Sequence, residues 1–170
     1  MNSRPSTMVI EGVDSRFEME MLYRQFPDAE DYLDGNWIVT RFQANRSWFE
    51  VDFINILHLG DLVWLRNELA KMHSASAGLI EWEPLDGFLK LVAAPDESGN
   101  VRWVIEMLYD DAEELRTSIE INNDSTALLD ILRQIDDVLG TFPLRGRQAR
   151  RTADPHTKAR DRTKVDRGIL

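Results

Sequence analysis

Residues 36–72 read NWIVTRFQANRSWFEVDFINILHLGDLVWLRNELAKM, and this stretch decides the fold. Apolar side chains recur at every second position in residues 37–42 and again in residues 48–54, with a turn predicted at residues 44–47. Such alternation, rich in aromatic and β-branched residues, is typical of strands and predicts an antiparallel hairpin. Its second strand would carry four side chains on one face: Trp48, Glu50, Asp52 and Ile54.

The same stretch then changes to a helical period. Four apolar residues recur at spacings of three and four: Leu62, Leu65, Leu69 and Met72. Asp61 near the start and Lys71 near the end carry the charges that a helix dipole favours at its two ends. An apolar stripe on a helix must be buried, so we expect this helix to pack against the strands before it.

Further segments with period two lie on both sides of this stretch. They occupy residues 7–13, 17–24, 78–84, 88–93, 101–109 and 115–121. In the second of them the apolar face consists of Phe17, Met19, Met21 and Tyr23. A second amphipathic helix is predicted after a polar cap at residues 122–125, with Gly140 as its C-terminal stop. The predicted fold is α+β: a mainly antiparallel, bent β-sheet of about eight strands, with two α-helices packed on it and no internal sequence repeat.

Charge divides the chain into two parts. The net charge is −10, but residues 145–170 hold nine basic and three acidic residues, which leaves a balance of −16 for residues 1–144. The segment 145–170 has almost no large apolar residue, so we expect a disordered basic tail behind one folded domain spanning residues 1–144. A negative body repels nucleic acid and attracts basic partners, although solubility alone would explain the same charge.

Composition also excludes several classes of protein. The 170 residues include no cysteine, so disulfides and thiol chemistry are excluded. No apolar run is long enough for a membrane span, and the N-terminal residues do not resemble a signal peptide. We therefore expect a cytoplasmic protein with no membrane partner.

Motifs for bound metals, nucleotides or nucleophilic catalysis are not found. None of the three histidines, His58, His73 and His156, has a second ligand at helical spacing, and the acidic loops lack the calcium-loop pattern. There is no glycine-rich phosphate loop and no nucleophile elbow. The sequence therefore predicts no cofactor, no metal and no catalytic residue.

Three carboxylate pairs, each on one face of a predicted strand, remain as candidates. They are Glu18 with Glu20, Glu50 with Asp52, and Glu81 with Glu83. Acid–base catalysis by such a pair would define a small hydrolase or transferase, but it requires a concave pocket. Two tryptophans, Trp48 and Trp82, lie next to these acids, which favours a protein-binding surface over catalysis. Each tryptophan taken alone is nevertheless expected to be buried in the core, under the other helix. The candidate partner-binding residues are Glu18, Glu20, Trp48, Glu50, Asp52, Glu81, Trp82 and Glu83.

Several segments between about residues 30 and 145 resemble the WapI-type bacterial immunity proteins. These segments are DYLDGNWI (31–38), VDFINILHLGDLVWLRNELAKM (51–72), EWEPLDGFLKL (81–91) and SIEINNDSTALLDILRQIDDVLGTFP (118–143). The resemblance implies a cytoplasmic antidote, without enzymatic activity, that binds the cognate secreted polymorphic toxin of its own strain. Many such toxins are nucleases with basic surfaces, and the acidic body suits a partner of that kind.

A third interpretation is that of a regulatory or scaffold module. The acidic body is not expected to bind nucleic acid, whereas the basic tail of residues 145–170 could do so. Binding of this kind would be sensitive to salt and would be lost when the tail is removed.

Overall fold

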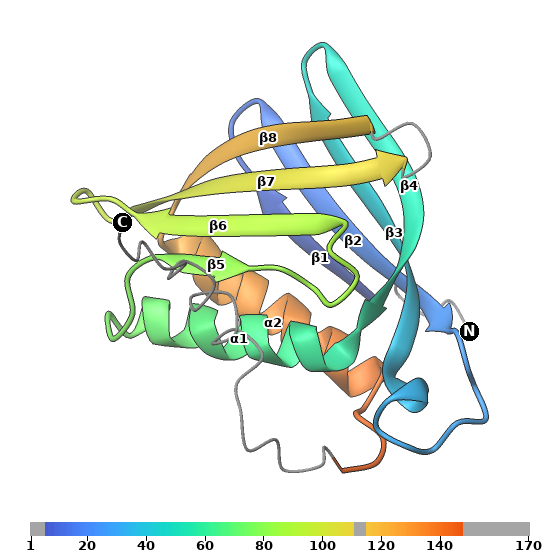
Figure 1. Cartoon of the computed structure of the whole chain (residues 1–170). Helices are drawn as coiled ribbons and strands as arrows, with labels where there is room; N and C mark the ends of the chain where they lie inside the picture. The colour runs from blue at the N-terminus through green and yellow to red at the C-terminus, as the bar shows by residue number, and fades with distance from the viewer. Residues whose placement is uncertain (1–5, 111–114, 148–170) are drawn as a thin grey trace, which may run out of the picture.

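The described residues form two four-stranded antiparallel sheets, each followed by a helix (Figure 1). The computed structural model describes residues 6–110 and 115–147. The first sheet comprises β1 (Ser6–Glu11), β2 (Ser15–Arg24), β3 (Trp37–Arg46) and β4 (Phe49–His58), in that order, and α1 (Leu59–His73) follows it. The second comprises β5 (Ile80–Trp82), β6 (Leu89–Pro95), β7 (Asn100–Asp110) and β8 (Leu115–Asp124), also in order, and α2 (Thr126–Thr141) follows it. A short 3-10 helix, η1 (Asp34–Asn36), precedes β3.

This arrangement confirms the predicted α+β fold with eight strands and two helices, and it divides the strands into two sheets. The order of four strands and one helix occurs twice along the chain. The repeat is one of topology, and it accompanies no repeat of fixed period in the sequence. Figure 1 shows the second sheet lying across the first, with both helices along one end.

The core lies between the two sheets and the two helices. It is a single cluster to which both sheets and both helices contribute buried apolar side chains. Its largest fully buried members are Trp103, Phe17 and Phe42. Phe42 and Phe53 of the first sheet stack on each other and meet Phe88, which precedes β6, at centroid distances of 4.9 and 6.2 Å. The alternation that predicted the strands therefore directs one face of each sheet into a shared core.

The turn between β3 and β4 differs from the prediction. β3 continues to Arg46 and pairs with Phe49, so the turn consists of Ser47 and Trp48 alone. Trp48 is therefore not part of a strand face, and it lies at the tip of the hairpin with 82% of its surface exposed.

The apolar face of β2 is shorter than predicted. Phe17, Met19 and Met21 are buried, as expected, but Tyr23 is 59% exposed. The register with β3 shifts between Met21 and Tyr23, which indicates a β-bulge. A bulge turns the residues after it relative to the sheet, so Tyr23 leaves the core face.

Both helices have ends that the sequence did not fully predict. His58 caps α1, because its Nδ1 accepts a hydrogen bond from the backbone N–H of Gly60 at 3.1 Å. At α2 the capping side chain is Asp124, which accepts from the backbone N–H of Thr126 at 2.9 Å. The helix then runs through Gly140, the predicted stop, and ends at Thr141.

Arg145, which follows the predicted domain boundary at residue 144, makes hydrogen bonds to the domain. The Arg145 guanidinium donates to the carbonyls of Pro27 and Ala29 at 2.6 and 2.8 Å, and Asn36 bonds to the Arg145 backbone through both its amide atoms. A segment that begins the predicted tail is thus attached to the loop before β3. Residues 148–170, the rest of that tail, lie outside the described residues.

Candidate partner-binding surface

The outward side of the first sheet gathers most of the candidate residues. Alternation places side chains on this side wherever their neighbours point into the core. We define the acidic face as Glu18, Glu20, Arg41, Gln43, Glu50, Asp52 and Ile54. The sequence named four of these residues on separate strands, and the pairing of β2 with β3 and of β3 with β4 brings them together.

The strand register sets the layout of the acidic face. One row runs from Glu20 through Arg41 to Ile54, and the next runs from Glu18 through Gln43 to Asp52. Directly opposed residues on neighbouring strands lie close enough to interact, about 5 Å apart between Cβ atoms. Carboxylates from β2 and β4 therefore flank the polar side chains of β3.

Arg41 and Asp52 form the strongest contact on this face. The Arg41 Nε donates to Asp52 Oδ1 at 2.8 Å, its Nη2 donates to Oδ2, and Gln43 Nε2 donates to Oδ2 at 3.2 Å. These hydrogen bonds, chiefly those from Arg41, hold the pKa of Asp52 below its ordinary value. The same pairing raises the pKa of Arg41, and the charges of Glu20 and Glu18 add to that rise.

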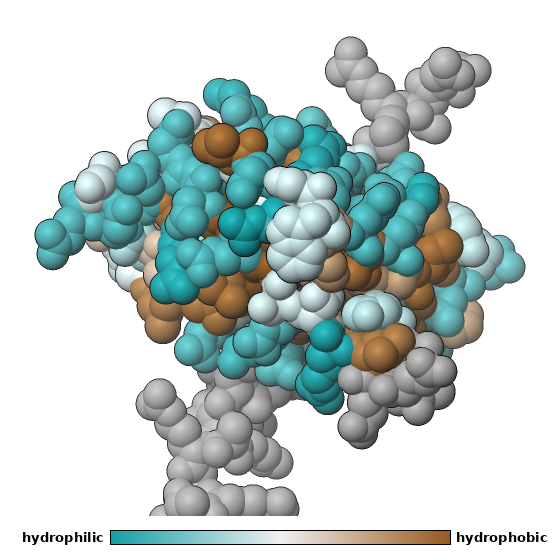
Figure 2. Space-filling model, turned by 90° about the horizontal axis from the view of Figure 1, so that it is seen from above, coloured by the Kyte–Doolittle hydropathy of each residue, from teal (hydrophilic) through white to brown (hydrophobic). Residues whose placement is uncertain are grey.

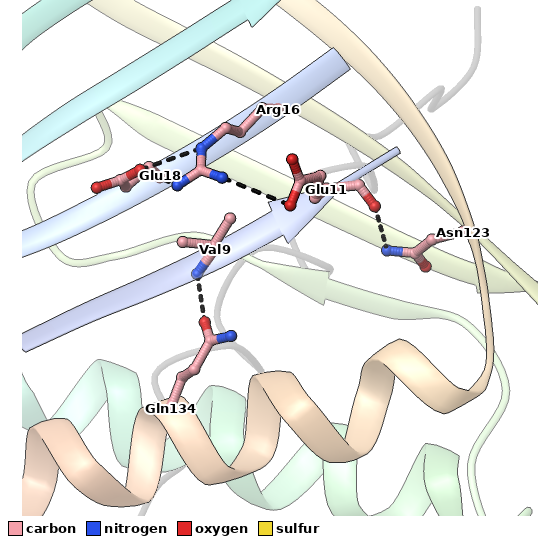
Figure 3. A network of polar contacts seen from close by, with 6 residues as sticks. All are labelled: Val9, Glu11, Arg16, Glu18, Asn123 and Gln134. Carbon is pink, nitrogen blue, oxygen red and sulfur yellow. Dashed lines mark hydrogen bonds and ion pairs between the residues drawn. The ribbon is translucent and has the colours of Figure 1, made fainter. Parts of the chain in front are cut away.

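Glu18 also has a partner, at the boundary with β1. Arg16 Nη2 donates to Glu18 Oε2 at 2.6 Å, and Arg16 Nη1 lies 3.5 Å from Glu11 Oε2 (Figure 3). The bond to Glu18 raises the pKa of Arg16 more than burial lowers it. Within the described residues, Glu20 and Glu50 have no ion-pair partner, so these two carboxylates can accept an external cation without breaking an internal contact.

Exposed apolar side chains accompany the charges. Ile54 lies on the acidic face with 62% of its surface exposed, and Trp48 lies at the hairpin tip beyond Glu50. The Trp48 ring packs edge-on against Phe49 at 6.0 Å. Figure 2 views the molecule from the end where the β3–β4 hairpin projects, and there hydrophobic patches interrupt a mostly hydrophilic surface. A large exposed aromatic beside charged groups is typical of a protein-binding surface.

The remaining three candidates lie elsewhere. Glu81 and Glu83 are exposed on and after β5 of the second sheet, outside the acidic face. Trp82 is only 2% exposed, and its Nε1 donates to the backbone carbonyl of Asp61 at 3.0 Å. It alternates with Glu81 and so points into the core against α1, which removes it from the surface.

Neither of two hollows formed by the described residues collects the three carboxylate pairs. A hollow of about 370 Å³ on the second sheet has Glu83 at its margin, together with Lys90, Glu106 and Arg116, but none of the other candidate carboxylates lines it. Asp86, whose pKa is raised by burial, lies outside that lining. Among residues 6–110 and 115–147, no three side chains of the metal-binding types lie together, and no helix there is long and apolar enough to cross a membrane.

The sequence placed Ile54 on the same strand face as Glu50 and Asp52, but Arg41, Gln43 and Ile54 were not among the predicted partner-binding residues. Their signal was present, because each occupies the same alternating face of its strand as a named or opposed candidate. Finding them required the pairing register, which places Arg41 opposite both Glu20 and Ile54.

The molecule is thus an α+β protein with two four-stranded antiparallel sheets and an acidic, partly apolar outer face. The sequence model of the immunity protein WapI-like family matches residues 8–143, and the chain belongs to this family. The match extends from β1 to just past the end of α2, and it confirms the resemblance seen in the sequence. Membership supports an immunity role with a toxin protein as partner.

Two solved structures match the chain at low sequence identity. Trypanosoma bruciei MRP1/MRP2 gives a TM-score of 0.48 at 9% identity, covering 81% of this chain and 86% of that chain. WHY1 from Arabidopsis thaliana gives 0.46 at 11% identity, covering 84% and 88%. No curated protein sequence matches the chain.

Proposed function

We propose that this protein neutralises a cognate secreted polymorphic toxin by binding it directly in a one-to-one complex, without enzymatic activity. The observation that carries the proposal is the family match over residues 8–143. It spans both sheets and both helices, which supports an immunity role for the domain that they form.

We further propose that the toxin is of the nuclease type. A nuclease needs a basic surface for its substrate, and residues 1–144 carry a balance of −16. Electrostatic potentials of opposite sign on two proteins accelerate their association and disfavour binding to other partners. An acidic protein seated on such a surface would also exclude the negatively charged substrate.

The acidic face is the proposed contact surface. Trp48 offers an anchor that the partner can bury, and Glu20 and Glu50 offer carboxylates that have no ion pair within 4.0 Å among the described residues. Asp52 is held by Arg41 and Glu18 by Arg16, so these two would contribute through the field more than through new contacts. Aromatic anchors surrounded by polar residues supply most of the energy in many interfaces.

Co-expression with the toxin domain encoded beside this gene tests the proposal. We expect growth to be rescued and a stable one-to-one complex to be recovered. Trp48→Ala should weaken the complex by about 10-fold or more, the loss typical of a central aromatic anchor, while leaving the free energy of unfolding unchanged, because the side chain is exposed. Absence of both rescue and complex would refute the proposal for that toxin.

Charge reversals locate the contact surface. Glu20→Lys and Glu50→Lys should weaken binding, whereas Glu97→Lys, in the exposed turn between β6 and β7, makes the same charge change away from the acidic face. Glu81→Lys and Glu83→Lys test the two candidates on the second sheet. Equal losses for Glu50→Lys and Glu97→Lys would show that net charge, and not this face, determines affinity.

A further inference from the structure

The four edge strands of the two sheets are not equally accessible. α2 packs along β1, and its Gln134 side chain accepts from the backbone N–H of Val9 at 2.6 Å (Figure 3). β8 lies beside β1 and β2, and Asn123 Nδ2 donates to the Glu11 carbonyl at 3.3 Å. β5 has only three residues. Within the described residues, the ten-residue strand β4 has no such contact along its edge, whereas β8 is in contact with the first sheet through its C-terminal part.

The hairpin register shows which backbone groups of β4 point away from the sheet. Arg46 and Phe49 close a two-residue turn, so they form a hydrogen-bonded pair. Hydrogen-bonded and non-hydrogen-bonded pairs then alternate along an unbroken ladder. Alternate residues of β4 therefore direct their backbone N–H and C=O groups outward: Glu50, Asp52, Ile54, Ile56 and His58.

One side-chain contact agrees with this assignment. The backbone N–H of Ile56 donates to the Asn55 side-chain oxygen at 2.8 Å, as expected for an amide without a partner in β3. For Glu50, Asp52 and Ile54, the register directs the N–H away from β3, and no bond from it to a loop, turn or side chain is found within the described part of the chain. These three residues also carry their side chains on the acidic face, so the open edge and the candidate surface adjoin.

We propose that the toxin adds an extended segment to β4, continuing the first sheet by one strand. The inference rests on the proposed function and specifies how binding occurs. Backbone pairing would supply affinity, while side chains facing the acidic face would supply specificity. Because Glu50 is acidic without an ion-pair partner among the described residues and Ile54 is apolar, the added segment carries lysine or arginine beside Glu50 and an apolar residue beside Ile54.

The charges favour this occupant over a second copy of the chain. Antiparallel pairing of two β4 strands would place the Glu50 and Asp52 carboxylates of both copies on one continuous sheet face. Like charges on neighbouring strands are destabilising, whereas a basic segment would neutralise them. Charged side chains are also a common device by which edge strands avoid pairing with themselves.

Amide hydrogen exchange, resolved by residue with NMR, tests the inference on the full chain. In the free protein, the amides of Glu50, Asp52 and Ile54 should exchange about 100-fold faster than those of Val51 and Phe53, which bond to β3. Addition of the toxin domain encoded beside the gene should slow the first three by about 100-fold and change the other two little. Protection of the three in the free protein at low concentration would overturn the inference.

A pair of variants at Ile54 provides a second readout. Ile54→Pro removes the outward N–H at an edge position that tolerates proline, and Ile54→Thr changes the side chain while keeping the N–H. We expect Ile54→Pro to weaken the complex by about 10-fold or more and Ile54→Thr by less than about 3-fold. If Ile54→Pro does not fold, the exchange pattern decides the question without it.

The outcomes separate the two proposals. A wild-type complex without the alternating protection, or one that Ile54→Pro leaves unchanged, overturns strand addition and leaves the immunity function standing. Failure of the wild-type protein to bind the toxin overturns both. Protection of the three amides that grows with protein concentration in the absence of toxin would identify a second copy as the occupant and overturn the inference.

Discussion

Replacement of Asn36 by alanine should loosen the attachment of the C-terminal segment to the domain. Asn36 ends η1 and is fully buried. Its Nδ2 donates to the carbonyls of Tyr32 and Arg145 at 2.8 and 3.0 Å, and its Oδ1 accepts from the Arg145 N–H at 2.9 Å. Alanine removes all three hydrogen bonds at once.

The loss can be estimated bond by bond. Each intramolecular hydrogen bond contributes about 1 kcal/mol net, and a buried group left without a partner costs about 1–3 kcal/mol. Because the three bonds are partly buried, we expect a decrease of about 3 kcal/mol in the free energy of unfolding. For a domain of this size, that decrease corresponds to a Tm lower by about 10 °C.

Urea unfolding of the wild-type and variant chains measures this difference, with the slope m as a check that both unfold to comparable states. Asn67→Ala is the matched control, because Asn67 is an exposed residue in the middle of α1. The control should change stability by less than about 0.5 kcal/mol. A loss below about 1 kcal/mol for Asn36→Ala would show that this amide does not hold residues 143–146 in place.

Three further predictions concern backbone conformation, a sheet edge and an ion pair. Gly146→Ala should destabilise the protein by about 1–2 kcal/mol, because φ is +64° and a Cβ would lie 2.5 Å from the Tyr32 backbone nitrogen. Gly140→Ala in α2 should instead stabilise it by about 0.5–1 kcal/mol, because alanine favours a helix more than glycine does. Thermal unfolding that ranks the two variants the other way would contradict both expectations. Gln134→Ala should cost about 1–2 kcal/mol and speed amide exchange at Val9, and unchanged exchange there would show that the side chain does not close the β1 edge. Arg41→Gln should raise the pKa of Asp52 toward its ordinary 3.8, which carboxyl NMR titration would measure. Since the folded-state pKa of Asp52 is depressed, the stability contributed by this pair is present above pH 3.8 and is lost as the pH falls through the folded-state pKa. An Asp52 titration that is the same in the variant and the wild type would refute the pairing.

The fold was largely predictable from periodicity, and the errors in the prediction have local causes. Alternation located the strands because each sheet has one buried face. It misplaced Tyr23, since a bulge shifts the register after Met21, and it assigned Trp48 to a strand when that residue forms half of a two-residue turn. Gly140 was expected to end α2, yet a helix continues through glycine where its backbone hydrogen bonds are maintained.

The candidate site was predictable only in part, because it depends on long-range pairing. The sequence indicated Glu18, Glu20, Glu50 and Asp52 as outward-facing residues, but not that β3 brings them onto one surface. For each tryptophan taken alone the sequence favoured burial in the core, while its place beside acidic residues favoured a binding surface. Trp82 packs against α1, whereas Trp48 lies beyond the end of both strands.

The contact between Val9 and Gln134 joins residues 125 positions apart, so the first strand meets its covering helix late in synthesis. At about 5–20 residues per second, a ribosome needs on the order of ten seconds to make the intervening chain. Until then the edge of β1 lacks the helix that covers it, and folding that depends on such distant contacts is slow. If the protein acts as an antidote, a cell is therefore protected by the finished molecules it already holds, and chains still on the ribosome add nothing to its defence.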